Sequence, residues 1–217
     1  AHEIKNPLTP IQLTIDRLKS KYSSQLSEKD KSNFKENLKI INNQIKQIEK
    51  LVNEFSDFAR MPKPIFQNND LAELIIENIK LLQELETSIE IKFESNLPII
   101  NFESDKEQLS RVFLNLIKNS IESIQQKVQY DNNTNKKIDI EINDHDDHIN
   151  LTIIDTGIGF ENLKSNIKDI LNPYFTTKKN GTGLGLSIVN KIINDHNGNI
   201  EFIPINDGAK IKIIFKR

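Results

Sequence analysis

The sequence of 217 residues contains no cysteine, so it can build neither a disulfide framework nor a thiolate metal site. No apolar run approaches the roughly 20 residues that cross a bilayer, and no signal-peptide pattern opens the chain. An excess of one charge is also lacking, since the formal net charge is −2 and the pI about 6.2. This balance gives no general attraction for nucleic acid or anionic lipid. The composition suits a globular protein from a reducing compartment.

Glycine and proline are scarce and unevenly placed. Neither occurs between Pro10 and Pro62, and all seven glycines lie at or after Gly157. Five of the glycines fall in two short segments, 157–159 and 181–185. Because these residues punctuate local structure most strongly, we expect long helices over 11–61 and specialised loops within 155–185.

Apolar residues recur at alternating spacings of three and four in the N-terminal part. The second stretch carries Phe34, Leu38, Ile41, Ile45, Ile48, Val52, Phe55 and Ala59, and the first carries Ile4, Leu8, Ile11, Ile15, Leu18 and Tyr22. This heptad pattern predicts two helices, joined by a turn over 23–31 with Ser27 as the helix N-cap. A lone antiparallel hairpin leaves part of each apolar stripe in water, which predicts a homodimer closing a four-helix bundle. The alternative is a hairpin packed on its own C-terminal domain.

Met-Pro-Lys-Pro at 61–64 ends the second helix and marks a domain boundary, giving domains at 1–61 and 65–217. Beyond it, helical and alternating patterns take turns. We expect helices at 70–86, 105–127 and 184–196, and strands at 89–95, 99–102, 137–144, 149–155, 199–204 and 209–215. The predicted fold class is α+β: a helical hairpin, then an α/β sandwich with helices on one face of a largely antiparallel sheet. His196, at the end of the last predicted helix, is attributed to the helix dipole.

Three segments of the second domain carry polar or glycine-rich signals. Asn115 and Asn119 lie four residues apart on one helical face, which suggests a shared polar ligand, although surface polarity is the alternative. Asp155 ends a predicted strand and is followed by Thr-Gly-Ile-Gly, where a simple turn is the alternative. Gly181-Thr-Gly-Leu-Gly185 opens a helix and can present N–H groups to phosphate, without the spacing of a dinucleotide fingerprint or a P-loop.

In this order, the three segments resemble the N, G1 and G2 boxes of the histidine-kinase/gyrase/Hsp90-type ATPases, and 172–178 resembles the F box of histidine kinases. The resemblance covers essentially all of 65–217 and implies the family's ATP-binding sandwich with ATP and Mg²⁺ as ligands. It implies that Asn119 ligates Mg²⁺, Asp155 reads adenine and Phe175 is the mobile-loop aromatic. The 21 residues between Gly159 and Gly181 imply a short ATP lid. The implied ATP-binding residues are Asn115, Asn119, Asp155, Gly157, Gly159, Phe175, Thr177, Lys178, Gly181, Thr182, Gly183, Leu184 and Gly185.

One position separates the branches of this family. Its hydrolysing members carry a glutamate four residues before the Mg²⁺-binding asparagine, and Asn115 stands there in this chain. An amide cannot act as a general base toward water. We therefore expect a kinase, with a hydrolysing ATPase as the alternative.

The chain opens Ala-His-Glu-Ile-Lys-Asn-Pro, with His2 and Asn6 four residues apart on one helical face. With the hairpin, this opening resembles the H box of a dimerisation and histidine-phosphotransfer domain covering 1–61. HEIKNPLTPIQL and FARMPKP look most like the NtrY subgroup of nitrogen-regulation sensor kinases. The resemblance implies that His2 is the phosphoacceptor, that Glu3 orients its ring and takes its other proton, and that Asn6 positions water for dephosphorylating a partner.

We therefore expect the transmitter core of a two-component signal-transduction system: a phosphoprotein that autophosphorylates on His2 with Mg-ATP and passes the phosphoryl group to an aspartate of a response regulator. Pro7 and Pro10 are expected to loosen the helix beyond His2. An ATP-binding phosphatase or dimer scaffold without autokinase activity is a further alternative. We expect a cytoplasmic fragment of a longer protein whose absent segments anchor it in the bacterial inner membrane.

Overall fold

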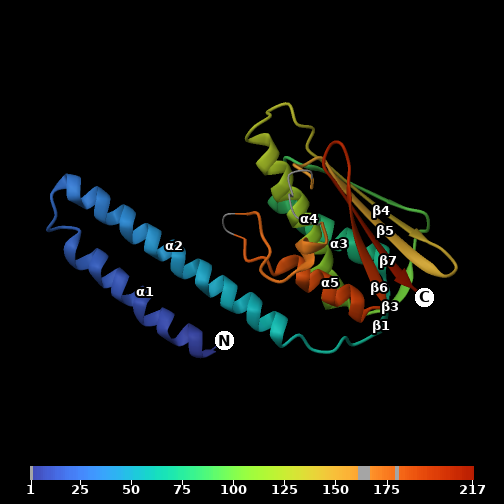
Figure 1. Ribbon diagram of the computed structural model, residues 1–217, viewed down its shortest axis with the longest axis horizontal. Helices are drawn as coiled ribbons and strands as arrows, with labels where there is room; N and C mark the ends of the chain where they lie inside the picture. Colours follow the sequence, from blue (N-terminus) through green and yellow to red (C-terminus); the bar gives the residue numbers. More distant parts are fainter. Residues whose placement is uncertain (1, 161–166, 179–180) are drawn as a thin grey trace. The chain divides into compact units, whose positions relative to one another are not determined.

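The computed structural model describes residues 2–160, 167–178 and 181–217. The chain divides into two compact units. The first comprises Ala1–Met61 with Thr176–Leu184, and the second comprises Pro62–Phe175 with Gly185–Arg217. The first unit contains a helical hairpin and the second a sheet with helices, as the sequence pattern predicts (Figure 1).

The hairpin consists of α1 (His2–Tyr22) and α2 (Glu28–Ala59). The Ser27 hydroxyl caps α2 by accepting a hydrogen bond from the Asp30 N–H at 3.2 Å, as predicted. α2 begins directly after this cap, at Glu28, so the turn predicted over 23–31 is too long at its C-terminal end. Among the described residues, no helix combines the length and the apolar character needed to cross a membrane.

Two prolines, Pro7 and Pro10, lie inside α1, and the helix continues through both of them. One turn further on, the Thr14 hydroxyl donates to the Pro10 carbonyl at 2.8 Å. A threonine hydroxyl that donates to the carbonyl four residues earlier competes with the backbone N–H for that carbonyl. The backbone hydrogen bonds that residues 7 and 10 of a regular helix would donate are therefore missing from α1, because proline lacks an N–H group.

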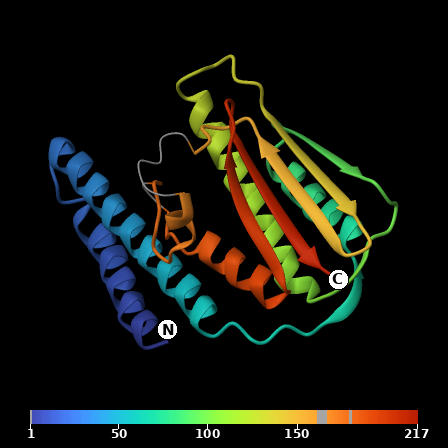
Figure 2. The same cartoon turned by 45° about the vertical axis from the view of Figure 1, so that its right-hand side comes forward.

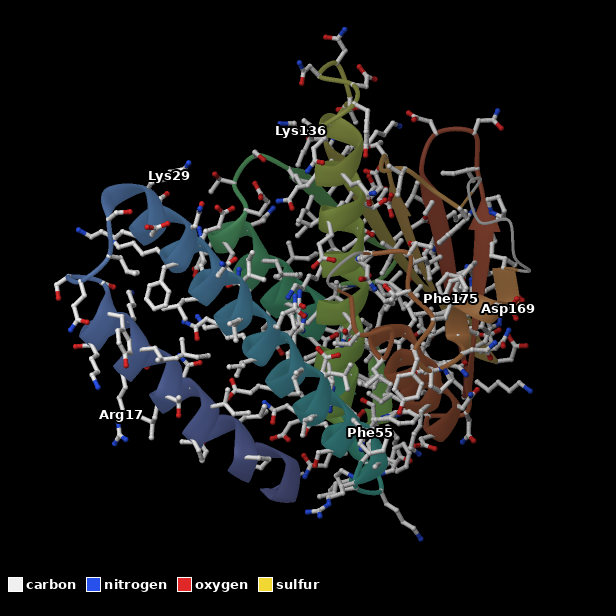
Figure 3. The ribbon with its side chains drawn as sticks, turned by 60° about the vertical axis from the view of Figure 1, so that its left-hand side comes forward. Arg17, Lys29, Phe55, Lys136, Asp169 and Phe175 are labelled. Carbon is white, nitrogen blue, oxygen red and sulfur yellow. The ribbon has the colours of Figure 1, made fainter. Side chains whose placement is uncertain are left out.

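The heptad seam is split between a buried and an exposed half. Four of the buried members are 4–6% exposed and form a cluster against which Phe34 packs: Leu8, Ile15, Leu38 and Ile45. Seam members that alternate with these are 38–45% exposed: Ile11, Leu18, Ile41, Ile48 and Phe55. Phe55 lies near the C-terminal end of α2 (Figure 3). The two helices thus cover part of each apolar stripe and leave the rest on the surface.

A five-stranded sheet forms the centre of the second unit. Its strands are β2 (Glu90–Ser95), β4 (Lys137–Asp144), β5 (His148–Asp155), β7 (Ala209–Lys216) and β6 (Gly198–Pro204), in that spatial order. β2 runs parallel to β4, and the other neighbours are antiparallel. In β4 the buried Ile138, Ile140 and Ile142 alternate with polar residues, so one face of the sheet carries the core. The predicted largely antiparallel sheet is confirmed.

Three helices cover the apolar face of this sheet: α3 (Leu71–Leu85), α4 (Lys106–Val128) and α5 (Gly185–Asp195) (Figures 1 and 2). α4 contacts β4 and β5, and α5 contacts β6. On α4 the fully buried Leu109, Leu116 and Ile124 face the sheet. This packing fixes α4 over the end of β5, where the polar signals of the sequence converge.

The sequence pattern did not predict two short elements, a strand and a 3₁₀ helix. β1 (Gln67–Asp70) pairs antiparallel with β3 (Asn101–Ser104) in a separate two-stranded sheet. β1 reads Gln-Asn-Asn-Asp, a composition depleted in strands, so no local pattern indicated it. The 3₁₀ helix η1 (Ile167–Leu171) is too short to give a periodic signal. The strand expected at 99–102 is shifted to β3.

The segment that follows Pro62 is tied to the start of α4. Asp105 caps α4 by accepting from the Gln108 N–H at 3.0 Å, and its second oxygen accepts from the Ile65 N–H at 2.9 Å. The Gln108 side-chain amide donates to the Pro62 carbonyl at 3.1 Å. Burial alone raises the pKa of Asp105, but the N–H groups of Ile65 and Gln108 outweigh it and hold the pKa below its usual range.

His196, which the sequence analysis attributed to the helix dipole, has a more specific role. It is 1% exposed, its Nδ1 lies 2.8 Å from the Ile192 carbonyl, and its Nε2 accepts from the Asp105 N–H at 3.0 Å. Because Nε2 accepts in this arrangement, the ring proton lies on Nδ1 and points to the Ile192 carbonyl. Phe66 packs edge-on against the ring, with centroids 5.2 Å apart. His196 therefore joins the end of α5 to the start of α4.

Candidate functional site

Asp155 is the last residue of β5 and the most deeply buried carboxylate of the candidate site, at 3% exposure. It pairs with Ile138 of β4 and Ala209 of β7, so the two neighbouring strands fix its backbone. Its carboxylate accepts hydrogen bonds from the Ser120 hydroxyl and the Gly157 N–H, each at 2.9 Å, and from the Ala209 N–H. Burial raises the pKa of Asp155, and these donors oppose the rise by favouring the ionised form.

The loop after Asp155 is pressed against α4. A Cβ at Gly157 would lie 2.1 Å from the Ser123 hydroxyl oxygen, so only glycine fits there. The same hydroxyl accepts from the Ile158 N–H at 3.1 Å. One residue later, Gly159 has φ +65°, and its Cβ would lie 2.3 Å from the Gly208 carbonyl oxygen. Two glycines that the sequence analysis assigned to the site are thus required by close backbone and side-chain contacts.

Asn115 and Asn119 lie on the same face of α4 and are both half-buried. The Asn115 amide donates to the Arg111 carbonyl at 2.8 Å, which leaves its oxygen to face Gly185. A Cβ at Gly185, the first residue of α5, would lie 3.1 Å from that oxygen. The structure therefore brings the first and third polar segments of the sequence together at Asn115 and Gly185.

Phe175 is half-buried and lies on the segment between β5 and α5 that also carries η1 and Asp169 (Figure 3). Its N–H donates to the Asn172 carbonyl at 3.2 Å, and Tyr174 before it has φ 70°. This turn sets the direction of Phe175. Residues 161–166 of the expected ATP lid lie outside the described residues.

The remaining residues of the expected phosphate loop belong to the first compact unit. They are Thr177, Lys178, Gly181, Thr182, Gly183 and Leu184. Gly183 has φ 70°, a conformation that glycine adopts without strain, and Leu184 is fully buried. The second unit contains five other expected site residues: Asn115, Asp155, Gly157, Gly159 and Gly185. The six residues of the expected phosphate loop are assigned to the first unit instead.

The expected phosphoacceptor segment begins α1. His2, Glu3 and Asn6 have helical backbone there, and their side chains lie outside the described residues.

Sequence reasoning missed the residues that hold Asp155 and its loop. Ser120, Ser123 and Lys127 are spaced three and four residues apart on α4, and each bonds the loop that begins at Asp155. Lys127 donates to the Thr156 carbonyl at 3.2 Å and forms an ion pair with Asp207. Their helical spacing after Asn119 was the available signal, since residues at such intervals occupy one helix face.

A pocket of about 1030 Å³ runs along α3 and α4. Leu81, Arg111, Leu114 and Asn115 are among its lining residues, and Asp155 is not. Its lining combines leucines with charged side chains of both signs and does not include the Asp155 carboxylate that the adenine role requires. We therefore place the candidate nucleotide site at the Asp155 loop rather than in this pocket.

Comparisons with known proteins agree with this fold. The family described as histidine kinase-, DNA gyrase B-, and HSP90-like ATPase matches residues 104–217, and the His Kinase A (phospho-acceptor) domain matches residues 1–64. The second unit is thus an ATP-binding domain of that ATPase class. With both matches on one chain, the protein belongs to the sensor histidine kinases of two-component systems.

Its relatives include NtrY-type kinases. Nitrogen regulation protein NtrY of Azorhizobium caulinodans is 37% identical over 219 residues, covering 100% of this chain and 28% of that protein. An NtrY-like sensor histidine kinase of Rickettsia felis is 38% identical over 216 residues, covering 99% of this chain and 34% of that protein. The chain therefore spans about a third of the length of these relatives.

Solved structures give the same result. The histidine kinase ThkA, crystallised in complex with the response regulator protein TrrA, is similar with a TM-score of 0.67 and 28% identity. That match covers 100% of this chain and 59% of ThkA. The catalytic domain of ThkA alone matches with a TM-score of 0.58 and 29% identity, covering 70% of this chain and 95% of the domain. The predicted combination of helical hairpin and ATP-binding sandwich is confirmed.

Proposed function

We propose that this chain is the autokinase core of a two-component sensor: it transfers the γ-phosphoryl group of ATP to His2 and then to an aspartate of a response regulator. The observation that carries the proposal is the buried Asp155 carboxylate, held by three protein donors beside a glycine loop and the two asparagines of α4. The phospho-acceptor domain match over residues 1–64, which contains His2, supports the choice of acceptor. We propose residues 1–61 as the phosphotransfer hairpin and 65–217 as the catalytic domain.

In the nucleotide-binding step, Asp155 accepts a hydrogen bond from the adenine amino group. Phosphate groups fit the N–H groups of the loop over 181–185 at the start of α5, where the helix dipole favours negative charge. Lys178 adds a cation, and Phe175 and Thr177 belong to the loop that covers the nucleotide. Asn119 suits Mg²⁺ because it offers a hard amide oxygen on a half-buried face. When bound, Mg²⁺ neutralises charge on the transferred phosphoryl group.

In the transfer step, a ring nitrogen of neutral His2 donates its lone pair to the γ-phosphorus. The new N–P bond forms as the bond from the γ-phosphorus to the bridging oxygen breaks, and ADP leaves with that oxygen. Glu3 accepts the proton from the other ring nitrogen and orients the ring before attack. The helical spacing of His2 and Asn6 supports a second activity, in which Asn6 positions water to dephosphorylate the response regulator.

Asn115 favours phosphotransfer over hydrolysis. Its amide nitrogen is engaged by the Arg111 carbonyl at 2.8 Å, and an amide offers no base to activate water. The γ-phosphate is then protected until His2 reaches it. A hydrolysing ATPase needs a base other than Asn115 to activate water. In the described part of the nucleotide site the carboxylate is that of Asp155, which is held by three donors and which we assign to the adenine amino group.

Homodimerisation through the hairpin is part of the proposal. Five apolar seam residues of α1 and α2 are 38–45% exposed in the single chain, and a second hairpin of the same kind presents the complementary stripe. The cytoplasmic location and an inner-membrane anchor in the longer protein remain predictions, as does a role in nitrogen regulation.

Incubation with γ-labelled ATP tests the proposal. We expect acid-labile, base-stable label on the wild-type chain, lost in His2→Gln and kept in His145→Gln, which changes an exposed histidine of the β4–β5 turn. Label that survives His2→Gln would refute the acceptor. ATP binding without label would favour a phosphatase or scaffold, and multiple-turnover phosphate release unaffected by His2→Gln would favour a hydrolysing ATPase. Asp155→Asn should abolish ATP affinity, while Asp139→Asn on the neighbouring strand should not.

A further inference from the structure

Ser120 follows Asn119 on α4 and is the side chain that links this helix to Asp155. Its hydroxyl donates to Oδ2 of Asp155 at 2.9 Å, and the residue is 2% exposed. The proposed ATP-binding motifs assign no role to this position. A serine buried in a helix among apolar neighbours costs free energy unless its hydroxyl is bonded, and Asp155 is its acceptor.

The donors around the Asp155 carboxylate differ in kind. Gly157 donates to Oδ1 through its backbone at 2.9 Å, and Ala209 also donates through its backbone. These two donors are supplied by the fold itself and persist with most side chains. Ser120 supplies the one side-chain donor of the three, and it acts on the other carboxylate oxygen.

Three donors leave about one of the four acceptor positions of a carboxylate for a ligand. That position can accept from an amino group but repels a carbonyl oxygen. Adenine carries an amino group where guanine carries a carbonyl, so a fixed and ionised carboxylate at this point selects adenine over guanine. A carboxyl group that takes up a proton loses this selectivity because it can then donate as well as accept. A carboxylate that rotates loses it because the remaining acceptor position no longer points at the amino group.

We propose that Ser120 is a positioning residue for purine selection: its hydroxyl fixes the orientation and the ionised state of Asp155, so that the remaining lone pair accepts the adenine amino group. This inference rests on the proposed ATP-binding function. The groups that face Asp155 are Ser120 and the charged Lys127 from α4, Gly157 from the loop and Ala209 from β7. Ile138, its partner on β4, is apolar.

The direction in which the pKa of Asp155 changes when the Ser120 hydroxyl is removed can be predicted. Burial already raises the pKa of Asp155, and the Ser120 hydrogen bond opposes that rise by stabilising the charged form. Without it, the pKa of Asp155 rises further, because the charged form loses a hydrogen bond. If ATP binding needs the ionised carboxylate, the fall of ATP affinity at acid pH must then begin at a higher pH.

The test compares Ser120→Ala with Ser123→Ala in the full chain. Ser123 is the matched control because its hydroxyl bonds the same loop at Ile158, at 3.1 Å, without touching the carboxylate. Two quantities are measured for each variant: the pKa of Asp155 by carboxyl-carbon NMR, with Asp155→Asn identifying the resonance, and the affinities for ATP and GTP as a function of pH. Ser120→Cys, which keeps a similar side-chain volume with a weaker donor, serves if the alanine variant does not fold.

We expect Ser120→Ala to raise the pKa of Asp155, to weaken ATP binding by about tenfold near neutral pH and to narrow the preference for ATP over GTP. Ser123→Ala should leave the pKa and the preference unchanged. An Asp155 pKa that is the same in Ser120→Ala and wild type would overturn the role of Ser120. Wild-type protein that binds no ATP would refute the nucleotide function instead, and the pKa comparison still decides whether Ser120 controls the carboxylate.

Discussion

At the scale of single residues, the position of Asp155 depends on a glycine far along the chain. Gly208 has φ +110°, and a Cβ there would lie 1.7 Å from the Asp155 carbonyl oxygen. Its own carbonyl oxygen meets Gly159 of the loop. The turn before β7 therefore lies directly against the backbone of Asp155, where no side chain fits, and it delivers the Ala209 N–H to the carboxylate.

We expect Gly208→Ala to destabilise the second unit by roughly 3 kcal/mol, because the new Cβ combines a backbone clash with an unfavourable φ. The thermal unfolding midpoint should fall by on the order of 10 °C. Asn206→Ala, an exposed change in the same turn, is the control and should shift the midpoint by less than about 2 °C. A Gly208→Ala protein as stable as this control would contradict the packing described for the turn.

At the scale of elements, the caps of α3 and α4 have different tasks. Asp70 caps α3 by accepting from the Ala72 N–H at 3.0 Å and also accepts from Ile100 at 3.0 Å. Asp105 caps α4 and in addition binds the N–H of Ile65, in the segment that follows the helical hairpin. One carboxylate thus starts the helix of Asn115 and Asn119 and fastens the chain that leads into the domain.

We expect Asp105→Ala and Asp70→Ala each to lower stability by about 1 kcal/mol through the lost cap. Only Asp105→Ala should speed amide hydrogen exchange at Ile65 and Phe66, measured by NMR or mass spectrometry. Equal protection of these two amides in both variants would show that Asp105 does not fasten the segment.

The lowered pKa of Asp105 predicts that the stability of the protein depends on pH. The folded-state pKa of Asp105 lies below its usual value of 3.8, so its stabilising contribution is present above that value and is lost as the pH falls through the folded pKa. Wild type should therefore lose more stability than Asp105→Asn between about pH 4 and pH 2. Unfolding by denaturant at a series of pH values measures this, and parallel curves for the two proteins would contradict it.

At the scale of the whole molecule, the exposed half of the heptad seam predicts that two copies of the chain associate. Ile41, Ile48 and Phe55 lie along α2 at seam spacing, each 43–45% exposed. An apolar stripe of this kind is stable in water only when another surface covers it. We expect a particle of twice the 25.0 kDa chain mass in solution.

Ile48→Glu places a charge in the middle of the proposed bundle interface, where burying it without a partner costs several kcal/mol. We expect this variant to be monomeric by light scattering or sedimentation at concentrations where the wild type is dimeric. Lys39→Glu, an exposed charge change on the same helix, is the control and should remain dimeric. A dimeric Ile48→Glu protein would exclude this face of the hairpin as the interface.

Much of the architecture was predictable because it is encoded locally. The heptad spacing around Leu38 and Ile45 indicated the hairpin, Ser27 indicated the start of α2, and the strand ending at Asp155 was found with its glycine loop. β1 was missed because Gln-Asn-Asn-Asp has no strand pattern and becomes a strand only by pairing with β3. The role of His196 was missed because one of its partners, the Asp105 N–H, comes from the cap of α4, 91 residues earlier in the chain.

By itself, the sequence determined the helical hairpin, the α/β class of the second unit and the order of the asparagine, aspartate and glycine motifs, since periodicity and motif spacing are properties of neighbouring residues. The tertiary structure alone decided which half of the seam is buried and which groups hold Asp155. The Ser120 donor comes from 35 residues earlier in the chain, and the Ala209 donor comes from an adjacent strand. Hydrogen bonds across such separations depend on packing and strand register, which no local pattern encodes.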